Sequence, residues 1–283
     1  MRLINAMTLE IKEFVSEIPP YAILSHRWGE EEVSYQDFNN ASLRSQRAGF
    51  EKIRLTCTQA LQDGIEYAWV DTCCIDKTSS AELGEAINSM FKWYQWSKMC
   101  YAYLDDVDGD TILAARTGVA PGTSVWHASI AGSRWFTRGW TLQELIAPKD
   151  VQFYSRSWVW IGSKLSLITE LHEVTGVGED ILCGAPLNTV SVAERMRWAA
   201  DRVTTREEDT AYSLMGIFEV NMPMLYGEGS KAFLRLQEEI IKEWDDHSLF
   251  AWTASTESER QAPLRGILAQ TPREFAHSHN IVP

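Results

Sequence analysis

The sequence predicts an α/β protein with an open, mainly parallel sheet and a C-terminal helical subdomain. Two observations lead to this class. Short apolar runs alternate with helical patterns through the first two thirds of the chain, which is typical of parallel strands joined by right-handed crossovers. The last third then changes to helix signals. With 283 residues, 45% of them hydrophobic, the chain can bury a core without disulfides or metal.

The predicted strands are apolar runs that end at polar residues. The first run directly follows Pro19-Pro20. Four runs have this character: residues 21–25, 67–71, 99–104 and 151–154.

Helices are predicted between these runs, where apolar residues recur at helical spacing. Residues 50–63 form the first such segment. A capping box, Ser79-x-x-Glu82, opens the next one. A tryptophan-containing helix over about residues 138–147 ends before a proline.

The remaining segments set the expected division of the chain. Residues 107–132 are rich in Gly, Ala, Asp and Ser, which predicts a long loop or a small insertion. We expect residues 1–160 to form the α/β core and residues 161–283 a helical extension packed on it. Helices of this extension are predicted over residues 192–198, 206–218 and 229–245, followed by a loop-like end.

The charge balance excludes one class of partner and disfavours another. A formal charge of −13 argues against a nucleic-acid-binding surface and disfavours adsorption to anionic membranes. The five cysteines are odd in number and lack a CxxC pair, so we expect neither a disulfide framework nor a metal site. No run of about 18 apolar residues and no signal peptide is present, and we expect a cytoplasmic protein without a membrane span.

Polar and aromatic residues gather where the predicted strands end. In an open parallel sheet, ligands bind beyond the carboxyl ends of the strands, near the point where the strand order reverses. The segments at these ends are residues 25–29 (SHRWG), 71–76 (DTCCID) and 105–106 (DD), and the helix with residues 138–144 (RGWTLQE) adds a fourth contribution.

Familiar catalytic patterns are missing from the sequence. No G-x-S-x-G or G-x-G-x-x-G segment occurs, and Ser25 and His26 are strand neighbours whose side chains point to opposite faces. The segment from Gly227 resembles a phosphate loop only superficially. Cys73 is the strongest candidate for a thiol nucleophile, although a buried role is the commoner one.

A carboxylate is the remaining candidate. Glu144 lies on a mostly apolar, aromatic helix, where desolvation would raise its pKa. The structural alternative is that Glu144 faces solvent or pairs with Arg138.

Three segments together resemble the fungal heterokaryon-incompatibility (HET) domain. They are YAILSHRWG from Tyr21, WVDTCCIDK from Trp69 and RGWTLQEL from Arg138, in this order. The later segments 191–218 and 226–241 are similar to the region that follows in the same fungal proteins. Where some relatives carry Thr after the histidine, this chain has Arg27, which adds a positive charge at the end of the first strand.

HET domains trigger programmed cell death, and they are distantly similar to TIR domains, which have flavodoxin-like sheets. The segment from Tyr21 resembles the TIR text of the type DVFLSFRGED. The segment from Trp140 to Leu145 resembles the TIR helix WCLDEL, whose Glu is catalytic in the members that cleave NAD. The resemblance therefore implies a flavodoxin/TIR-like core and NAD as a substrate, without a prosthetic group.

The resemblance implies a role for each candidate residue. Glu144 would stabilise the oxocarbenium-like centre formed when the nicotinamide–ribose bond breaks. Arg27 and Arg138 would bind the pyrophosphate, Trp28 or Trp140 would stack on a ring, and Asp71 would hydrogen-bond a ribose or hold Arg27. The full binding set that we predict is Ser25, Arg27, Trp28, Asp71, Cys73, Arg138 and Trp140.

Two other functions stay open at this point. The chain could be a non-enzymatic death-signalling scaffold, or a hydrolase that depends on Cys73 or Cys74. In either of the death-signalling roles, we expect activation by self-association into a homo-oligomer. We also expect receptor-like regulatory domains in the same longer chain.

Overall fold

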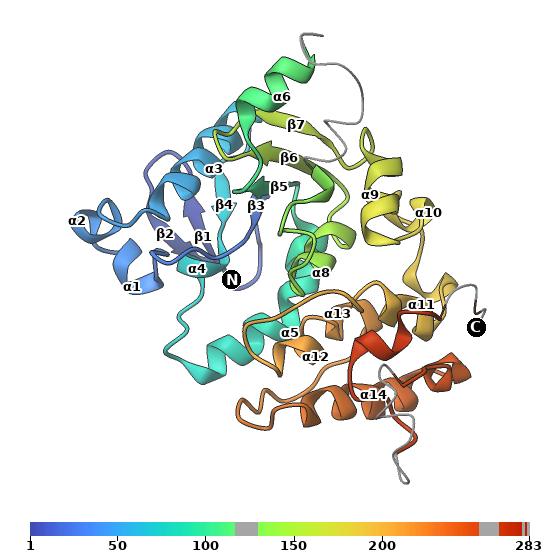
Figure 1. Cartoon of the computed structure of the whole chain (residues 1–283). Coiled ribbons are helices and arrows are strands. Elements are labelled where there is room, and N and C mark those ends of the chain that lie inside the picture. Colours follow the sequence, from blue (N-terminus) through green and yellow to red (C-terminus); the bar gives the residue numbers. More distant parts are fainter. Residues whose placement is uncertain (117–129, 255–265, 279–280, 282–283) are drawn as a thin grey trace. The chain divides into compact units, whose positions relative to one another are not determined.

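The computed structural model describes residues 1–116, 130–254, 266–278 and 281 (Figure 1). Its internal contacts divide the chain into two compact units. The first, here called the sheet unit, comprises Met1–Trp135 and Ala147–Leu167. The second, the helical unit, comprises Phe136–Ile146 and Ile168–Pro283. This division differs from the boundary expected at residue 160. The segment Phe136–Ile146 belongs to the helical unit, although the residues that follow it, Ala147–Leu167, return to the sheet unit.

In the described part of the sheet unit, seven strands form one sheet in the order β2-β1-β4-β3-β5-β6-β7 (Figure 1). The four predicted strands are confirmed as the central, mutually parallel ones. Their bounds are β3 Tyr21–His26, β4 Tyr67–Trp69, β5 Met99–Leu104 and β6 Val151–Ser155.

Three further strands flank the predicted ones, and all three pair antiparallel. The sequence reasoning missed them because each spans three or four residues, too few to display an alternating pattern. They are β1 Arg2–Asn5, β2 Ile11–Glu13 and β7 Trp160–Ser163. The sheet is therefore mixed at its edges and parallel at its centre.

The order of the parallel strands defines where a ligand site would lie. In chain order, β4-β3-β5-β6 reads second, first, third, fourth, which is the order of a doubly wound sheet of flavodoxin type. After β4 the chain crosses back over β3 to form β5, so the direction in which successive strands are added to the sheet reverses between β3 and β5. The carboxyl ends of these two strands, at His26 and Leu104, mark the topological switch point.

Two long helices cover opposite faces of this sheet. Tyr101 of β5 donates a 2.6 Å hydrogen bond to Asp63, which directly follows α3 (Phe50–Gln62). Tyr21 points to the other face, because it is an odd number of residues from Leu24, the register partner of Tyr101. On that face the Tyr21 hydroxyl donates to the Trp93 carbonyl of α5 (Ser80–Trp96).

Short helices fill the connections of the sheet unit. The expected cap of α5 is present, since the Ser79 hydroxyl accepts from the Glu82 amide at 3.3 Å. Residues 107–132 were expected to form a long loop or a small insertion, and the loop alternative is wrong for their first part, where Asp108 accepts from the Thr111 amide at the start of a helix. The rest of that prediction, residues 117–129, lies outside the described residues. The short helices are α1 Tyr35–Phe38, α2 Ala41–Arg44, α4 Asp71–Cys74 and α6 Gly109–Arg116.

The helical unit has its own core, centred on a buried arginine. The Arg195 guanidinium lies 4.8 Å from the ring centres of both Phe218 and Trp244, and Nη1 donates to the Ile217 carbonyl at 3.1 Å. Its α-helices are α8 Thr141–Ile146, α9 Ile168–Thr175, α10 Glu179–Leu182, α11 Val192–Arg197, α12 Asp209–Tyr212, α13 Met215–Phe218 and α14 Lys231–Glu243. The described residues of this unit also form 3-10 helices at Leu187–Thr189, His247–Phe250 and Pro272–Phe275.

The helices predicted in this unit are confirmed with two differences. The single helix expected over 206–218 is divided into α12 and α13, and α13 ends at Glu219 in the left-handed region. The chain end is less loop-like than expected, because Ala269 exchanges two backbone hydrogen bonds with the buried Gln237 amide of α14, at 2.8 and 3.0 Å.

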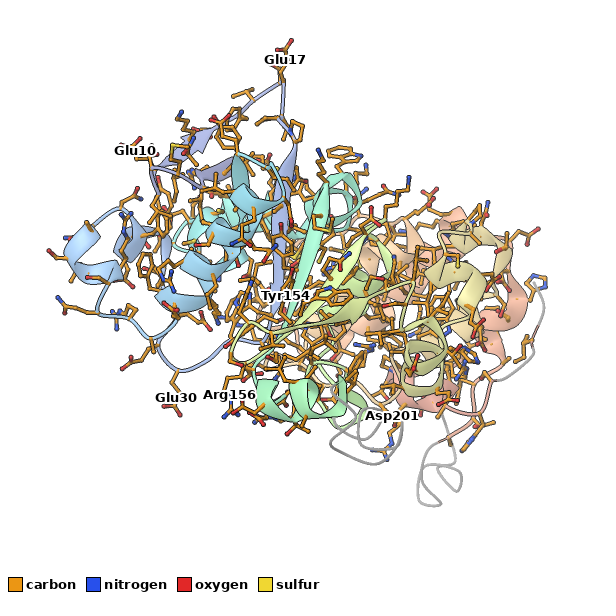
Figure 2. All side chains as sticks on the ribbon, turned by 90° about the horizontal axis from the view of Figure 1, so that it is seen from above. Glu10, Glu17, Glu30, Tyr154, Arg156 and Asp201 are labelled. Carbon is orange, nitrogen blue, oxygen red and sulfur yellow. The ribbon has the colours of Figure 1, made fainter. Side chains whose placement is uncertain are left out.

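Exposed glutamates lie on loops of the sheet unit. Figure 2 shows Glu10, Glu17 and Glu30 projecting outward from loops of the sheet unit, whereas Tyr154 lies within β6. Among the described helices, none is both long enough and apolar enough to cross a membrane.

Candidate functional site

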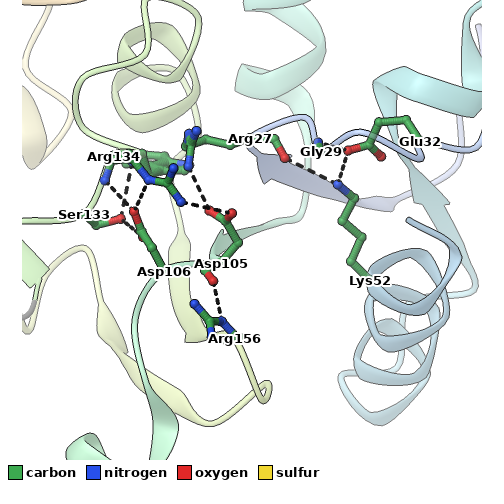
Figure 3. A network of polar contacts seen from close by, with 10 residues as sticks. Arg27, Gly29, Glu32, Lys52, Asp105, Asp106, Ser133, Arg134 and Arg156 are labelled. Atoms are coloured by element: carbon green, nitrogen blue, oxygen red, sulfur yellow. Dashed lines mark hydrogen bonds and ion pairs between the residues drawn. The ribbon is translucent and has the colours of Figure 1, made fainter. Parts of the chain in front are cut away.

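The carboxyl ends of β3 and β5 carry a network of charged side chains (Figure 3). Arg27, directly after β3, contacts the Asp105 carboxylate at 3.3 Å. Asp105 and Asp106 follow β5, and Arg134 contacts both of them, at 3.9 and 3.1 Å. Arg156, directly after β6, donates to the Asp105 carbonyl at 2.7 Å. The topological switch point thus presents three guanidinium groups and two carboxylates.

A second cluster lies between β3 and β4. The Trp28 indole N–H donates to Asp71 Oδ2 at 2.8 Å, and the Lys77 ammonium lies 3.6 Å from the centre of the Trp28 ring. The other Asp71 oxygen lies 3.7 Å from His26 Nε2. This arrangement corrects one expectation: Asp71 holds Trp28 rather than Arg27, because Arg27 pairs with Asp105 across the strand ends.

His26 occupies the centre of this second cluster. Its side chain is 1% exposed, and Nε2 lies 3.9 Å from Glu32 Oε2. The other Glu32 oxygen binds the Lys52 ammonium at 2.5 Å, and Lys52 also donates to the Arg27 carbonyl. His26 Nε2 therefore lies near two carboxylates, Glu32 and Asp71, at distances too long for direct hydrogen bonds.

The Ser25 side chain makes a structural hydrogen bond and is not exposed to solvent. Its hydroxyl is fully buried and accepts a 3.0 Å hydrogen bond from the equally buried Trp135 indole. His26, the next residue, contacts Asp71 on the other side of the strand, as the alternation of strand side chains predicts. Ser25 and His26 therefore do not form a nucleophile–base pair.

Cys73 is buried in a group of thiols. Burial, with neighbouring Cys74 and Cys57, raises the pKa of the Cys73 thiol well above its usual range. Its Sγ contacts the Val70 carbonyl at 3.8 Å, within the first turn of α4. Since a cysteine nucleophile requires an accessible thiolate, this environment argues against a hydrolase built on Cys73.

The remaining predicted site residues belong to the helical unit. Trp140 donates to Asp209 at 3.3 Å, and Asp209 also accepts from the Tyr226 hydroxyl at 2.9 Å. Burial raises the pKa of Asp209, and these hydrogen bonds oppose the rise. Arg138 adds a favourable charge near the same carboxylate.

Glu144 is buried on α8 at 7% exposure. Its charged neighbour is Arg202, whose guanidinium donates to the Arg138 carbonyl at 2.9 Å and to the Thr141 hydroxyl at 3.1 Å. Burial lowers the pKa of Arg202 to about 9, and the Glu144 carboxylate opposes this shift. The structural alternative in which Glu144 faces solvent is therefore wrong.

The glycine-rich segment at 227–229 does not present a phosphate-binding loop. The Glu208 carboxylate accepts hydrogen bonds from the amides of Gly227 and Gly229, at 2.7 and 3.1 Å. Both glycines have a positive φ, of 107° and 60°, which exposes their amides on one side. The chain itself therefore supplies the anion at this loop.

The comparisons with known proteins address the family. Residues 21–124 match the family described as heterokaryon incompatibility protein (HET), and residues 231–281 match a domain of unknown function (DUF8212). The vegetative incompatibility protein HET-E-1 of Podospora anserina is 52% identical over 230 residues, or 80% of this chain. This chain contains a HET domain.

The chain spans 16% of the length of HET-E-1. No solved structure matched the chain, so the likeness to TIR domains stays a prediction.

The matched HET segment contains the ends of β3, β4 and β5, with Arg27, Trp28 and Asp71. The structure gathers these three on the sheet unit, whereas Arg138, Trp140 and Glu144 belong to the helical unit. In residues 1–116, 130–254 and 266–278, no group of three His, Cys, Asp or Glu side chains is arranged to hold a metal ion.

Several residues of the charged clusters in the two units could not be predicted from the sequence. Arg134 stands four residues before the RGWTLQEL motif that begins at Arg138, and Lys52 and Glu32 carry no local signal because their partners are distant in the chain. The sequence signal for His26 is the acidic run that follows it, which contains its neighbour Glu32. The missed residues are His26, Glu32, Lys52, Arg134, Arg202 and Asp209.

Proposed function

We propose that this chain is the cell-death effector part of a heterokaryon-incompatibility protein and that it cleaves NAD at the nicotinamide–ribose bond. The name of HET-E-1 supports the incompatibility role. The observation that carries the NAD proposal is the switch point of the sheet, where Arg27 and an exposed Trp28 ring stand at the end of β3. A cation and an aromatic face are the groups that bind a diphosphate and a nucleotide base.

Glu144 is the proposed catalytic carboxylate. When the bond between ribose and nicotinamide breaks, nicotinamide leaves with the bonding electrons and positive charge develops on the ribose. A carboxylate stabilises this oxocarbenium-like centre, and water then adds to it and releases a proton. In a largely buried position such a charge acts more strongly than it would in water.

The binding roles follow the same proposal. Arg27 and Arg138 would contact phosphate oxygens, and Trp28 or Trp140 would stack on a ring. Asp71 is held by Trp28 and His26, so it would serve mainly to fix the indole. Ser25 and Cys73, both fully buried, would support the strand ends rather than contact the ligand.

Regulation in this proposal comes from association and from the rest of a longer chain. We propose that copies become active when they assemble, and that receptor-like domains of the same polypeptide control the assembly. NAD is then a substrate, and no prosthetic group is required.

The deciding experiment compares NAD consumption by wild-type protein, Glu144→Gln and Glu238→Gln at high protein concentration. Glu238 is an exposed glutamate on α14 and serves as the matched control. We expect wild type and Glu238→Gln to release nicotinamide at the same rate. Glu144→Gln should release it at least about 100-fold more slowly.

Thermal melting and cross-linking are measured on the same samples. They show whether the Glu144→Gln protein is folded and assembles, which matters because Arg202 loses its charged neighbour. Absence of turnover in assembled wild-type protein would reject the NAD reaction and leave a scaffold that signals by assembly.

A further inference from the structure

The network at the ends of β3 and β5 contains more positive than negative charge around one point. Arg27 and Arg134 both contact the Asp105 carboxylate, one at each oxygen, at 3.3 and 3.9 Å (Figure 3). Arg134 is also paired with Asp106, so the network as a whole, with three guanidinium groups (Arg27, Arg134 and Arg156) and two carboxylates (Asp105 and Asp106), carries a net charge of +1. This local excess contrasts with the formal charge of −13 for the whole chain.

Arg134 is held in place by other groups. Asp106 accepts hydrogen bonds from the Arg134 amide at 2.8 Å, from Arg134 Nε at 3.1 Å and from the Ser133 hydroxyl at 2.7 Å. Although burial alone would raise it, these hydrogen bonds lower the pKa of Asp106. The next residue, Trp135, is anchored to Ser25 of β3. The backbone position of Arg134 is therefore fixed, which reduces the entropy that binding would otherwise cost.

The contacts between the Asp105 carboxylate and its two arginines, Arg27 and Arg134, are long. A strong charge-assisted hydrogen bond has a distance of about 2.7–2.9 Å, and both contacts are longer. The Asp105 and Arg134 side chains are 38% and 61% exposed, so a solute can reach them from water. Arg156 binds the Asp105 backbone and so leaves the carboxylate to the other two arginines.

We propose that Arg27 and Arg134 form a binding site for a diphosphate group, and that Asp105 is the internal counter-ion that the diphosphate displaces. A diphosphate carries more negative charge than one carboxylate, and its two phosphoryl groups can each accept from one guanidinium fork. This inference rests on the proposed function for the identity of the ligand as the diphosphate of NAD. It assigns the second phosphate contact to Arg134, in the sheet unit, instead of Arg138.

The test is calorimetric titration with ADP-ribose, which contains the diphosphate and cannot undergo loss of nicotinamide. Inorganic pyrophosphate and adenosine are competitors that distinguish the charged group from the base. The variants are Arg134→Gln and Asp105→Asn, with Arg54→Gln as control. Arg54 is an exposed arginine of α3 that pairs with Glu51, so it matches Arg134 in charge change.

We expect Arg134→Gln to weaken ADP-ribose binding by about tenfold or more, because one charge-assisted contact is lost. Asp105→Asn is expected to tighten binding several-fold, because the competing carboxylate is gone. Arg54→Gln leaves the affinity unchanged. Pyrophosphate competes with ADP-ribose, and adenosine, which offers only the base for stacking on Trp28, competes more weakly.

Three results would overturn the site. They are no binding of ADP-ribose or pyrophosphate by wild-type protein at millimolar concentration, equal or weaker binding by a folded Asp105→Asn protein, and competition by adenosine alone. The proposed reaction fails separately: normal ADP-ribose binding without NAD cleavage rejects the enzyme and keeps the site. NAD cleavage with an unchanged KM in Arg134→Gln rejects the site and keeps the enzyme.

Discussion

The indole N–H of Trp28 donates to the carboxylate of Asp71, and this bond joins the end of β3 to the first residue of α4. Trp28 is 44% exposed, yet its edge is fixed by Asp71 and one face is covered by the Lys77 ammonium. An exposed aromatic ring held on two sides is suited to stacking, because little side-chain freedom remains to be lost.

Replacing Trp28 tests this stacking role directly. Trp28→Ala should weaken ADP-ribose binding by about tenfold, since stacking of a base on an aromatic ring contributes about 1–3 kcal/mol. Trp28→Phe keeps a ring and loses only the hydrogen bond to Asp71, so most of the affinity should remain. Equal affinities of the Ala variant and wild type would show that Trp28 does not contact the ligand.

Thiol reactivity should separate the five cysteines into two classes. Cys183 is exposed, whereas Cys57, Cys73, Cys74 and Cys100 are buried. Burial raises the pKa of Cys57 to about 12, so its thiolate is scarce as well as inaccessible. In the native protein we expect a thiol reagent to modify one cysteine rapidly and the other four only on unfolding, as followed by mass spectrometry. Rapid modification of Cys73 would restore the cysteine-hydrolase hypothesis.

Glu208 should stabilise the helical unit through the amides of Gly227 and Gly229. Glu208→Ala leaves both amides without this acceptor and is expected to reduce the free energy of unfolding by about 2 kcal/mol. Glu208→Gln retains an acceptor without the charge, so its effect should be smaller. Urea denaturation of the three proteins at neutral pH measures both differences.

The pH dependence of the Glu208 contribution has a defined sign. Hydrogen bonds from its own amide and from the Gly227 amide lower the pKa of Glu208 in the folded protein. Its contribution is therefore complete above the ordinary glutamate pKa and is lost as the pH falls through the lowered folded value. The stability gap between wild type and Glu208→Gln should shrink with acidification, and a constant gap would exclude the ionised carboxylate as its cause.

The central strands of the sheet could be predicted because each appears in the sequence as a run of mainly apolar residues. The central strands are buried on both faces, so β3 and β5 read as apolar runs. The edge strands β1, β2 and β7 do not, since three or four residues show no period. The break between α12 and α13 was invisible because the apolar pattern continues across it.

The candidate site was predicted less completely than the fold. Trp28 and Asp71 could be placed at strand ends from the sequence, because parallel strands share an edge. The hydrogen bond between Trp28 and Asp71 could not be predicted, and neither could the ion pair between Arg27 and Asp105. Such pairings depend on how loops from distant parts of the chain approach one another, which no local pattern encodes.

Alkaline pH should destabilise the sheet unit through Tyr154. Burial, with the nearby Asp63 charge, raises the pKa of Tyr154 to about 12, while an unfolded tyrosine titrates near 10. The folded state keeps the proton that the unfolded state loses, so stability is full below about pH 10 and falls as the pH rises toward 12. One tyrosine contributes about 1.4 kcal/mol per pH unit in this window.

A matched variant isolates this contribution. Tyr154→Phe keeps the ring, which stacks on Trp158 at a centroid distance of 4.8 Å, and removes the titrating hydroxyl. The slope of unfolding free energy against pH should decrease by one tyrosine equivalent between pH 10 and 12. Identical slopes for the two proteins would contradict the raised pKa.

The path of the polypeptide has a consequence for inheritance. The chain passes between the two units three times, after Trp135, Ile146 and Leu167. No contiguous stretch encodes one complete unit without part of the other. The family match at 21–124 covers β3, β4 and β5 but omits the remaining strands of the sheet. Recombination that transferred this segment alone would divide the sheet unit, so a portable gene segment must span the interleaved parts of both units.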